Sequence, residues 1–94
     1  IYFWNVKYQK AKLFKLQILI ILMERIVVDQ KILSGKPIIK GTRISVEFIL
    51  EMLSSGMSID EILLEYPHLK KEDVLAALIY ATSLLKREEV YLSR

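Results

Sequence analysis

The side chains in this sequence with catalytic potential are one histidine and a set of carboxylates. His68 lies in a turn after Pro67, and no nucleophile is close to it in the sequence. The carboxylates recur at the spacing of an exposed helix face: Glu47, Glu51, Asp60, Glu61 and Glu65. A metal-dependent nuclease needs acids that converge from distant elements, whereas a solvated helix surface explains this spacing directly. We therefore expect no catalytic residue and no enzymatic activity.

The sequence contains no cysteine, which excludes disulfides and thiolate nucleophiles. A single histidine without cysteine companions also argues against a zinc site. We expect no metal and no cofactor. A protein without disulfides suits a reducing compartment, so the expected location is the cytoplasm.

Basic side chains offer a second kind of chemistry, the binding of phosphate groups. Four of them fall in a stretch without any acid: Lys31, Lys36, Lys40 and Arg43. Thr42 adds a hydroxyl donor in the same stretch, so the loop is a candidate DNA-binding surface. The alternative for Arg43 is a structural ion pair with Glu47 or Asp60. Three further candidates surround the start of the last predicted helix: His68, Lys70 and Lys71.

The net charge does not by itself favour nucleic acid. The chain has a formal charge of +3, but residues 1–22 contain four lysines and no acid. The remaining 72 residues contain ten Lys or Arg against eleven Asp or Glu, which gives −1. Binding to DNA would therefore depend on the local basic patch.

Three helix starts follow the basic stretch. Ser45 and Ser58 have the hydroxyl that an N-cap requires, whereas Lys70, in the equivalent position, has no oxygen acceptor. Each start also has the apolar pair of a hydrophobic staple, namely Ile44 with Ile49, Met57 with Ile62 and Leu69 with Val74. The predicted helices cover residues 46–55, 59–66 and 71–89.

The segments before these helices read as a short β arm. Residues 25–33 and 38–39 are rich in β-branched side chains, which predicts short extended segments that pair with each other or across a dimer. Within the first stretch, the polar residues Asp29, Gln30 and Lys31 are expected to form a turn. Gly35 provides a turn before residues 38–39, and Gly41 permits a second sharp turn that leads into the helices. The predicted fold is mostly α, a trihelical helix-turn-helix unit of homeodomain-like type preceded by this arm.

The last predicted helix is too apolar to read bases in a DNA groove. One stripe is expected to face the core: Val74, Leu78, Ala81 and Leu85. A second group is expected to form a partner interface: Leu75, Ile79, Tyr80 and Leu84. Since 53% of this small chain is hydrophobic, a homodimer is expected to cover the surplus.

Residues 1–22 differ in character from the rest. Their longest uncharged apolar run, Leu16–Leu22, is far shorter than the about 20 residues that span a bilayer. We interpret residues 1–22 as a leader extension outside the native domain, which would cover residues 23–94, and expect no membrane partner. The alternative is an amphipathic helix on a membrane surface.

From Ile26 onward, the sequence resembles a widespread prokaryotic family of small helix-turn-helix proteins, a domain of unknown function. The family pattern is glycine-lysine-proline, two aliphatics, a basic residue, glycine-threonine-arginine, an aliphatic, a small polar residue and valine, and residues 35–46 match it throughout. Its later part is matched by Gly56, Ser58, residues 60–63, Tyr66-Pro67, Leu69, residues 72–74, Ala77-Leu78 and Tyr80-Ala81. The resemblance covers residues 24–87. Lys70 departs from the threonine or serine that is usual there.

Members of this family resemble the antitoxin halves of VapBC-type toxin-antitoxin systems. The resemblance implies a noncatalytic protein that binds and neutralises a PIN-like ribonuclease toxin and binds its own promoter DNA. The alternative is a protein-interaction or oligomerisation module that does not bind DNA.

Overall fold

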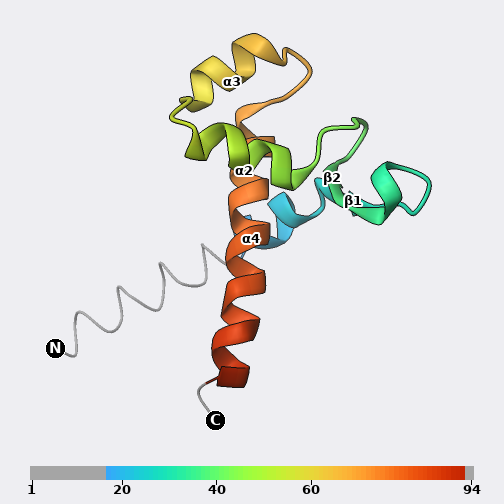
Figure 1. Ribbon diagram of the computed structural model, residues 1–94, viewed down its shortest axis with the longest axis vertical. Coiled ribbons are helices and arrows are strands. Elements are labelled where there is room, and N and C mark those ends of the chain that lie inside the picture. Colours follow the sequence, from blue (N-terminus) through green and yellow to red (C-terminus); the bar gives the residue numbers. More distant parts are fainter. Residues whose placement is uncertain (1–16, 93–94) are drawn as a thin grey trace, which may run out of the picture.

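A computed structural model describes the backbone of residues 17–92 and the side chains of residues 17–86. The fold is mostly helical, with one small antiparallel sheet before the main helices (Figure 1). The named elements are β1 (Ile26–Val28), the 3-10 turn η1 (Leu33–Gly35), β2 (Pro37–Ile39), α2 (Val46–Ser54), α3 (Ile59–Glu65) and α4 (Lys71–Leu92). Residues 17–23 are also helical. The four lysines that give residues 1–22 their positive charge lie within residues 1–16, outside the described residues.

The two strands pair with each other within one chain, with Ile26 opposite Ile39. The strand ends at Val28, and the turn expected around Asp29, Gln30 and Lys31 follows it, so this prediction is confirmed. After the turn, the chain forms the 3-10 turn η1 where a second short extended segment was expected. Asp29 explains the end of β1, since its carboxylate accepts a hydrogen bond from the backbone N–H of Lys31 at 2.9 Å and so forms a local turn.

The return to β2 depends on Gly35. This residue has a φ of 81°, which glycine adopts without strain. A Cβ at this position would also lie 2.7 Å from the side-chain nitrogen of Gln30. The exposed Gln30 side chain can move aside, so the backbone conformation is the reason for glycine, and the prediction of a glycine turn here is confirmed.

The first two helix starts form as the sequence predicts. The Ser45 hydroxyl accepts a hydrogen bond from the backbone N–H of Phe48 at 3.0 Å. At α3, the Ser58 hydroxyl accepts from the Glu61 N–H, and the Glu61 carboxylate accepts from the Ser58 N–H, which completes a capping box. Short polar side chains thus fix where both helices begin.

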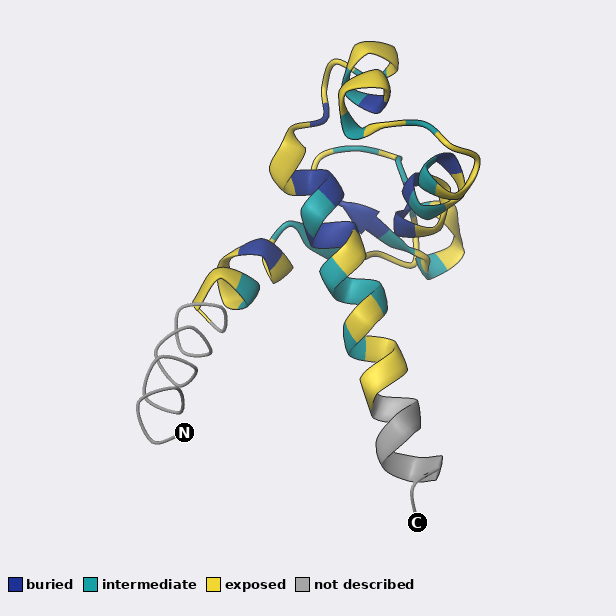
Figure 2. Cartoon of the chain, turned by 90° about the vertical axis from the view of Figure 1, so that its left-hand side faces the viewer, coloured by how far each residue is buried: buried dark blue, intermediate teal, exposed yellow. Residues whose placement is uncertain are grey.

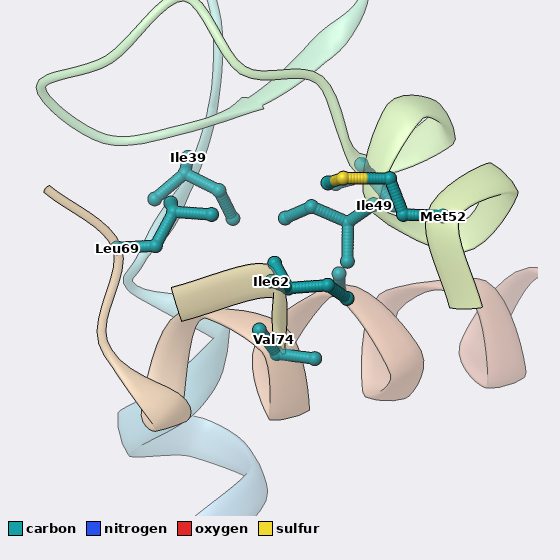
Figure 3. Close-up of a cluster of buried hydrophobic side chains, with 8 residues drawn as sticks. Ile39, Ile49, Met52, Ile62, Leu69 and Val74 are labelled. Atoms are coloured by element: carbon teal, nitrogen blue, oxygen red, sulfur yellow. The ribbon is translucent and has the colours of Figure 1, made fainter. Parts of the chain in front are cut away.

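The core gathers apolar side chains from every element between β2 and α4 (Figure 3). Its buried members are Ile39, Val46, Ile49, Met52, Ile62, Leu69, Val74 and Ala77. All three predicted staples contribute to it, because each pairs a buried residue with another core member or with a half-buried side chain packed against the core.

The face of α4 that packs on the core differs from the predicted one. Val74 and Ala77 are fully buried and Tyr80 packs against them, whereas Leu78 is 38% exposed and Leu85 is 63% exposed. The predicted core stripe was therefore wrong at both leucines. The physical reason is that several faces of α4 are apolar, and packing against the other core elements buries the face with Val74 and Ala77.

Two helical arms leave the packed part of the molecule: residues 17–23 and the second half of α4. Both extend from the same side of the packed part and diverge from each other, and many of their residues are exposed (Figure 2). Among the described residues, no helix has the length and apolar character needed to cross a membrane.

Candidate functional site

The four basic residues of the predicted DNA-binding loop are all exposed: Lys31, Lys36, Lys40 and Arg43. The ammonium of Lys36 lies 3.6 Å from the carboxylate of Glu47, and both side chains are more than half exposed. Such a pair contributes little to stability, so Lys36 remains available to a ligand. Glu47 had been a possible partner of Arg43, and it pairs with Lys36 instead.

Thr42 holds the loop together. Its hydroxyl donates a hydrogen bond to the carbonyl of Ile39 at 2.8 Å and accepts one from the backbone N–H of Ile44 at 3.0 Å. The donor that a phosphate would need is thus already used within the turn. The side chain of Thr42 therefore positions the basic loop, and the four charged residues are what the loop can present.

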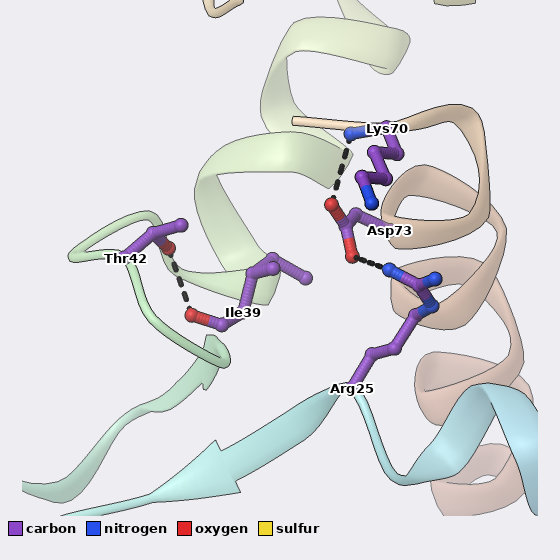
Figure 4. Close-up of polar contacts among 5 residues, drawn as sticks. All are labelled: Arg25, Ile39, Thr42, Lys70 and Asp73. Atoms are coloured by element: carbon purple, nitrogen blue, oxygen red, sulfur yellow. Dashed lines mark hydrogen bonds and ion pairs between the residues drawn. The ribbon is translucent and has the colours of Figure 1, made fainter. Parts of the chain in front are cut away.

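The start of α4 depends on a buried carboxylate that the sequence analysis missed (Figure 4). Asp73 is only 5% exposed. One of its oxygens lies 2.8 Å from the guanidinium of Arg25, and the other accepts a hydrogen bond from the backbone N–H of Lys70 at 2.9 Å. Asp73 therefore supplies half of a capping box for a helix whose N-cap residue, Lys70, cannot provide the other half.

Of the two contacts of Asp73, the one with the Lys70 N–H could have been predicted from the sequence. An acid three residues after the N-cap is the usual acceptor for the N-cap N–H, and this position was identifiable once Lys70 had been placed. The contact with Arg25 had no such signal, because the two residues are 48 positions apart.

A polar hollow of about 340 Å³ surrounds this pair, lined by Ile21, Glu24, Arg25, Lys40 and Asp73. It brings Lys40 of the basic loop to the same place as the start of α4. The charges in the hollow are mixed, and Arg25 already pairs with Asp73. It is therefore a poor site for a phosphate group, which would be opposed by two carboxylates.

The other predicted contacts for DNA lie at the surface. His68, Lys70 and Lys71 are exposed around the turn that leads into α4. Only the backbone of Lys70 has a described role, as the hydrogen-bond donor to Asp73. Their side chains are accessible to a ligand.

The outer surface of α2 and α3 is acidic. Five carboxylates are exposed there: Glu47, Glu51, Asp60, Glu61 and Glu65. Two exposed apolar side chains accompany them: Leu64, 81% exposed, and Phe48, 37% exposed. The ring of Phe48 packs edge-on against Tyr66, at 5.6 Å between ring centroids, which fixes its orientation. We call this surface the acidic face.

The capping box at the start of α3 affects the pKa of Glu61 on the acidic face. Hydrogen bonds from Ser58, first from its backbone N–H and then from its side chain, lower the pKa of Glu61 below its ordinary value. The hydrogen bonds favour the charged form, so the face keeps its negative charge at this position in mildly acidic solution.

The predicted partner interface on α4 divides into two parts. Tyr80 packs against the core, and Leu75 is half-buried. Ile79 lines an apolar groove between the two helical arms, and Leu84 is 42% exposed. The groove has a volume of about 310 Å³ and is lined by Leu19, Met23, Ile79, Thr82, Ser83 and Lys86. Within residues 17–86, no three His, Cys, Asp or Glu side chains gather as a metal site would require.

The family pattern of this chain is that of a protein of unknown function, DUF433, whose match covers residues 26–81. The chain belongs to the DUF433 family. A segment of 25 residues is 68% identical to an uncharacterized protein of Archaeoglobus fulgidus, and it makes up 27% of this chain and 69% of that protein.

The fold is similar to that of a crystal structure of a DUF433 member from Anabaena variabilis. The TM-score is 0.64, with 24% identity, and the similarity covers 94% of this chain and 84% of that one. It therefore extends beyond residues 26–81, onto segments that flank the DUF433 match. The likeness shows the fold, and function has to be proposed from the surfaces.

Proposed function

We propose that the protein is a noncatalytic, antitoxin-like domain that binds a PIN-like ribonuclease and neutralises it by contact. The acidic face of α2 and α3 carries this proposal. On α3, the exposed residues Asp60 and Glu61 lie one helical turn before Leu64, whose side chain is 81% exposed. An apolar centre with a charged rim is the usual composition of a protein-binding surface.

Charge explains why a ribonuclease fits this surface. An enzyme that binds RNA presents basic residues to the phosphate backbone. Carboxylates such as Glu61 and Glu65 can pair with these residues and so compete with RNA for the same cleft. The hydrogen bonds that lower the pKa of Glu61 keep one of these charges in place. Burial of Leu64 would then slow dissociation.

The test requires a PIN-like ribonuclease from a neighbouring open reading frame, with cleavage of a labelled RNA as the measurement. The wild-type protein should abolish cleavage at equimolar ratio, and Leu64→Lys should weaken inhibition by about 30-fold, the effect of losing a central contact of about 2 kcal/mol. Glu72→Lys is the matched control, because Glu72 is exposed on α4 outside the acidic face. Unchanged inhibition by Leu64→Lys, or none by the wild type, would contradict the proposal.

A second proposed function is binding to the promoter of its own gene. In this proposal α2, α3 and α4 act as a trihelical helix-turn-helix unit, and the exposed basic loop contacts phosphates. The observation in its favour is the exposure of Lys31, Lys36, Lys40 and Arg43 in a stretch without acids.

Fluorescence anisotropy with the upstream DNA at several salt concentrations tests this second function. Lys36→Gln with Lys40→Gln should weaken binding and reduce the salt dependence by about two phosphate contacts. Absence of binding by the wild type at low salt would exclude promoter binding and leave an interaction module that does not use DNA.

A further inference from the structure

Neither the proposed nuclease binding nor the proposed DNA binding uses the apolar groove between the two helical arms. Leu19 and Met23 line it from the side of residues 17–23, and Ile79 and Ser83 line it from α4. Its volume of about 310 Å³ is roughly ten times the about 30 Å³ that one water occupies in the liquid. It can therefore take up large side chains.

Among the described residues, the walls of the groove carry little charge. Residues 16–23 contain no charged side chain, and neither do the twelve residues from Val74 to Leu85. Of the groove-lining residues that the structure describes, Lys86 alone is charged. Nucleic acid would need several basic contacts, whereas depletion of charge is typical of the centre of a protein interface.

The exposed residues on α4 form a stripe along which a second helix can pack. Beside the groove, α4 carries a stripe at intervals of three, four and three residues: Leu75, Leu78, Thr82 and Leu85. This is the spacing by which one helix packs along another. Leu75 is half-buried and the other three are exposed, so the stripe is accessible.

Large aliphatic side chains are exposed on residues 17–23 and along α4. Seven of them are between 36% and 65% exposed: Ile18, Ile20, Ile21, Met23, Leu78, Leu84 and Leu85. Apolar surface that one chain leaves uncovered in this way is typical of a protein interface.

We propose that a second copy of this chain occupies the groove, with its own α4 packed along the α4 of the first. A twofold interface brings the same surface of two copies together, so a hollow must lie beside a ridge that fits it. The groove lined by Ile79 and Ser83 lies beside the ridge of Leu78 and Leu85 on one helix. Each copy thus offers both the ridge and the groove.

Sedimentation velocity of the full chain over a range of concentrations tests this proposal. The wild type should dimerise, and Leu85→Lys should raise the dissociation constant of the dimer by about 30-fold. Leu85 is 63% exposed, so the substitution leaves the fold of one chain intact, and circular dichroism checks this. Leu64→Lys is the matched control, because it places the same charge on the acidic face and should leave the dimer unchanged.

A wild-type chain that stays monomeric would overturn the proposal, and so would a dimer that Leu85→Lys does not weaken. Equal weakening by Leu85→Lys and Leu64→Lys would also overturn it, since the contact would then not lie at the groove. Nuclease inhibition measured on the same two variants keeps the two proposals separate. We expect Leu64→Lys to impair inhibition alone and Leu85→Lys to impair dimerisation alone.

Discussion

The packed part of this protein and its two helical arms are built from similar residues but bury them very differently. Ile62 on α3 is fully buried, whereas Ile20 and Ile21 in residues 17–23 are more than 60% exposed. The packed part surrounds its isoleucines with a strand and three helices, while the arms diverge and have little to pack against within one chain (Figure 2). Composition alone therefore does not distinguish a core residue from an interface residue.

The largest difference should appear when a core residue is truncated. Ile62→Ala should lower the free energy of unfolding by about 3 to 4 kcal/mol, because the change leaves a cavity in the centre of the core. Leu64→Ala, on the same helix but 81% exposed, should change it by less than about 0.5 kcal/mol. Urea denaturation followed by circular dichroism measures both. Similar losses in the two variants would show that the core is placed wrongly.

The ion pair between Asp73 and Arg25, which lies between residues 17–23 and β1, should have the next largest effect. Asp73→Ala removes the acceptor of the Lys70 N–H and the partner of Arg25, so we expect a loss of about 2 kcal/mol. Asp73→Asn should lose less, since an amide oxygen can still accept from Lys70. The exposed neighbour Glu72 provides the control, because Glu72→Ala should be nearly neutral. Equal stability of the alanine variant and the wild type would contradict the role of Asp73.

A hydroxyl at the start of α4 should stabilise the helix from which the second arm extends. Lys70→Thr would add the missing acceptor at the N-cap and complete the capping box with Asp73, so we expect a gain of about 1 kcal/mol. Thermal unfolding measures this gain as a higher Tm. Lys71→Thr, one position into the helix, is the control that should give no gain.

The smallest effect should be a pH dependence at the start of α3. Because the pKa of Glu61 is lowered in the folded protein, its capping contribution is fully present above its ordinary pKa and is lost as the pH falls through the lowered value. Glu61→Gln should remove this dependence. Carbon-detected NMR titration should place the pKa of Glu61 below its ordinary value, and an unshifted value would exclude the capping box in solution.

The features that the sequence predicted well depend on neighbouring residues. Ser45, Ser58 and Gly35 determine their own turn or cap within a few positions, so their signals were readable. The inward face of α4 was predicted wrongly at Leu78 and Leu85 because several faces of this helix are apolar, and packing against distant elements decided among them.

The candidate surfaces also divide into those that neighbouring residues predict and those that depend on distant contacts. The exposure of the basic loop and the acidic face agrees with their charge, since charged side chains seldom lie buried. The ion pair of Arg25 and Asp73 and the groove between the arms each join segments about fifty or more residues apart. Neither has a local pattern, so neither could be derived from the sequence.

The ion pair of Arg25 and Asp73 also has a kinetic consequence. It closes a loop of 48 residues, whereas the capping contacts of α2 and α3 span three residues each. Contacts of long range form after local ones, because their closure costs more chain entropy. We expect the segment before β1 to attach last during folding and to detach first. Asp73→Ala should accordingly speed unfolding while leaving the refolding rate almost unchanged.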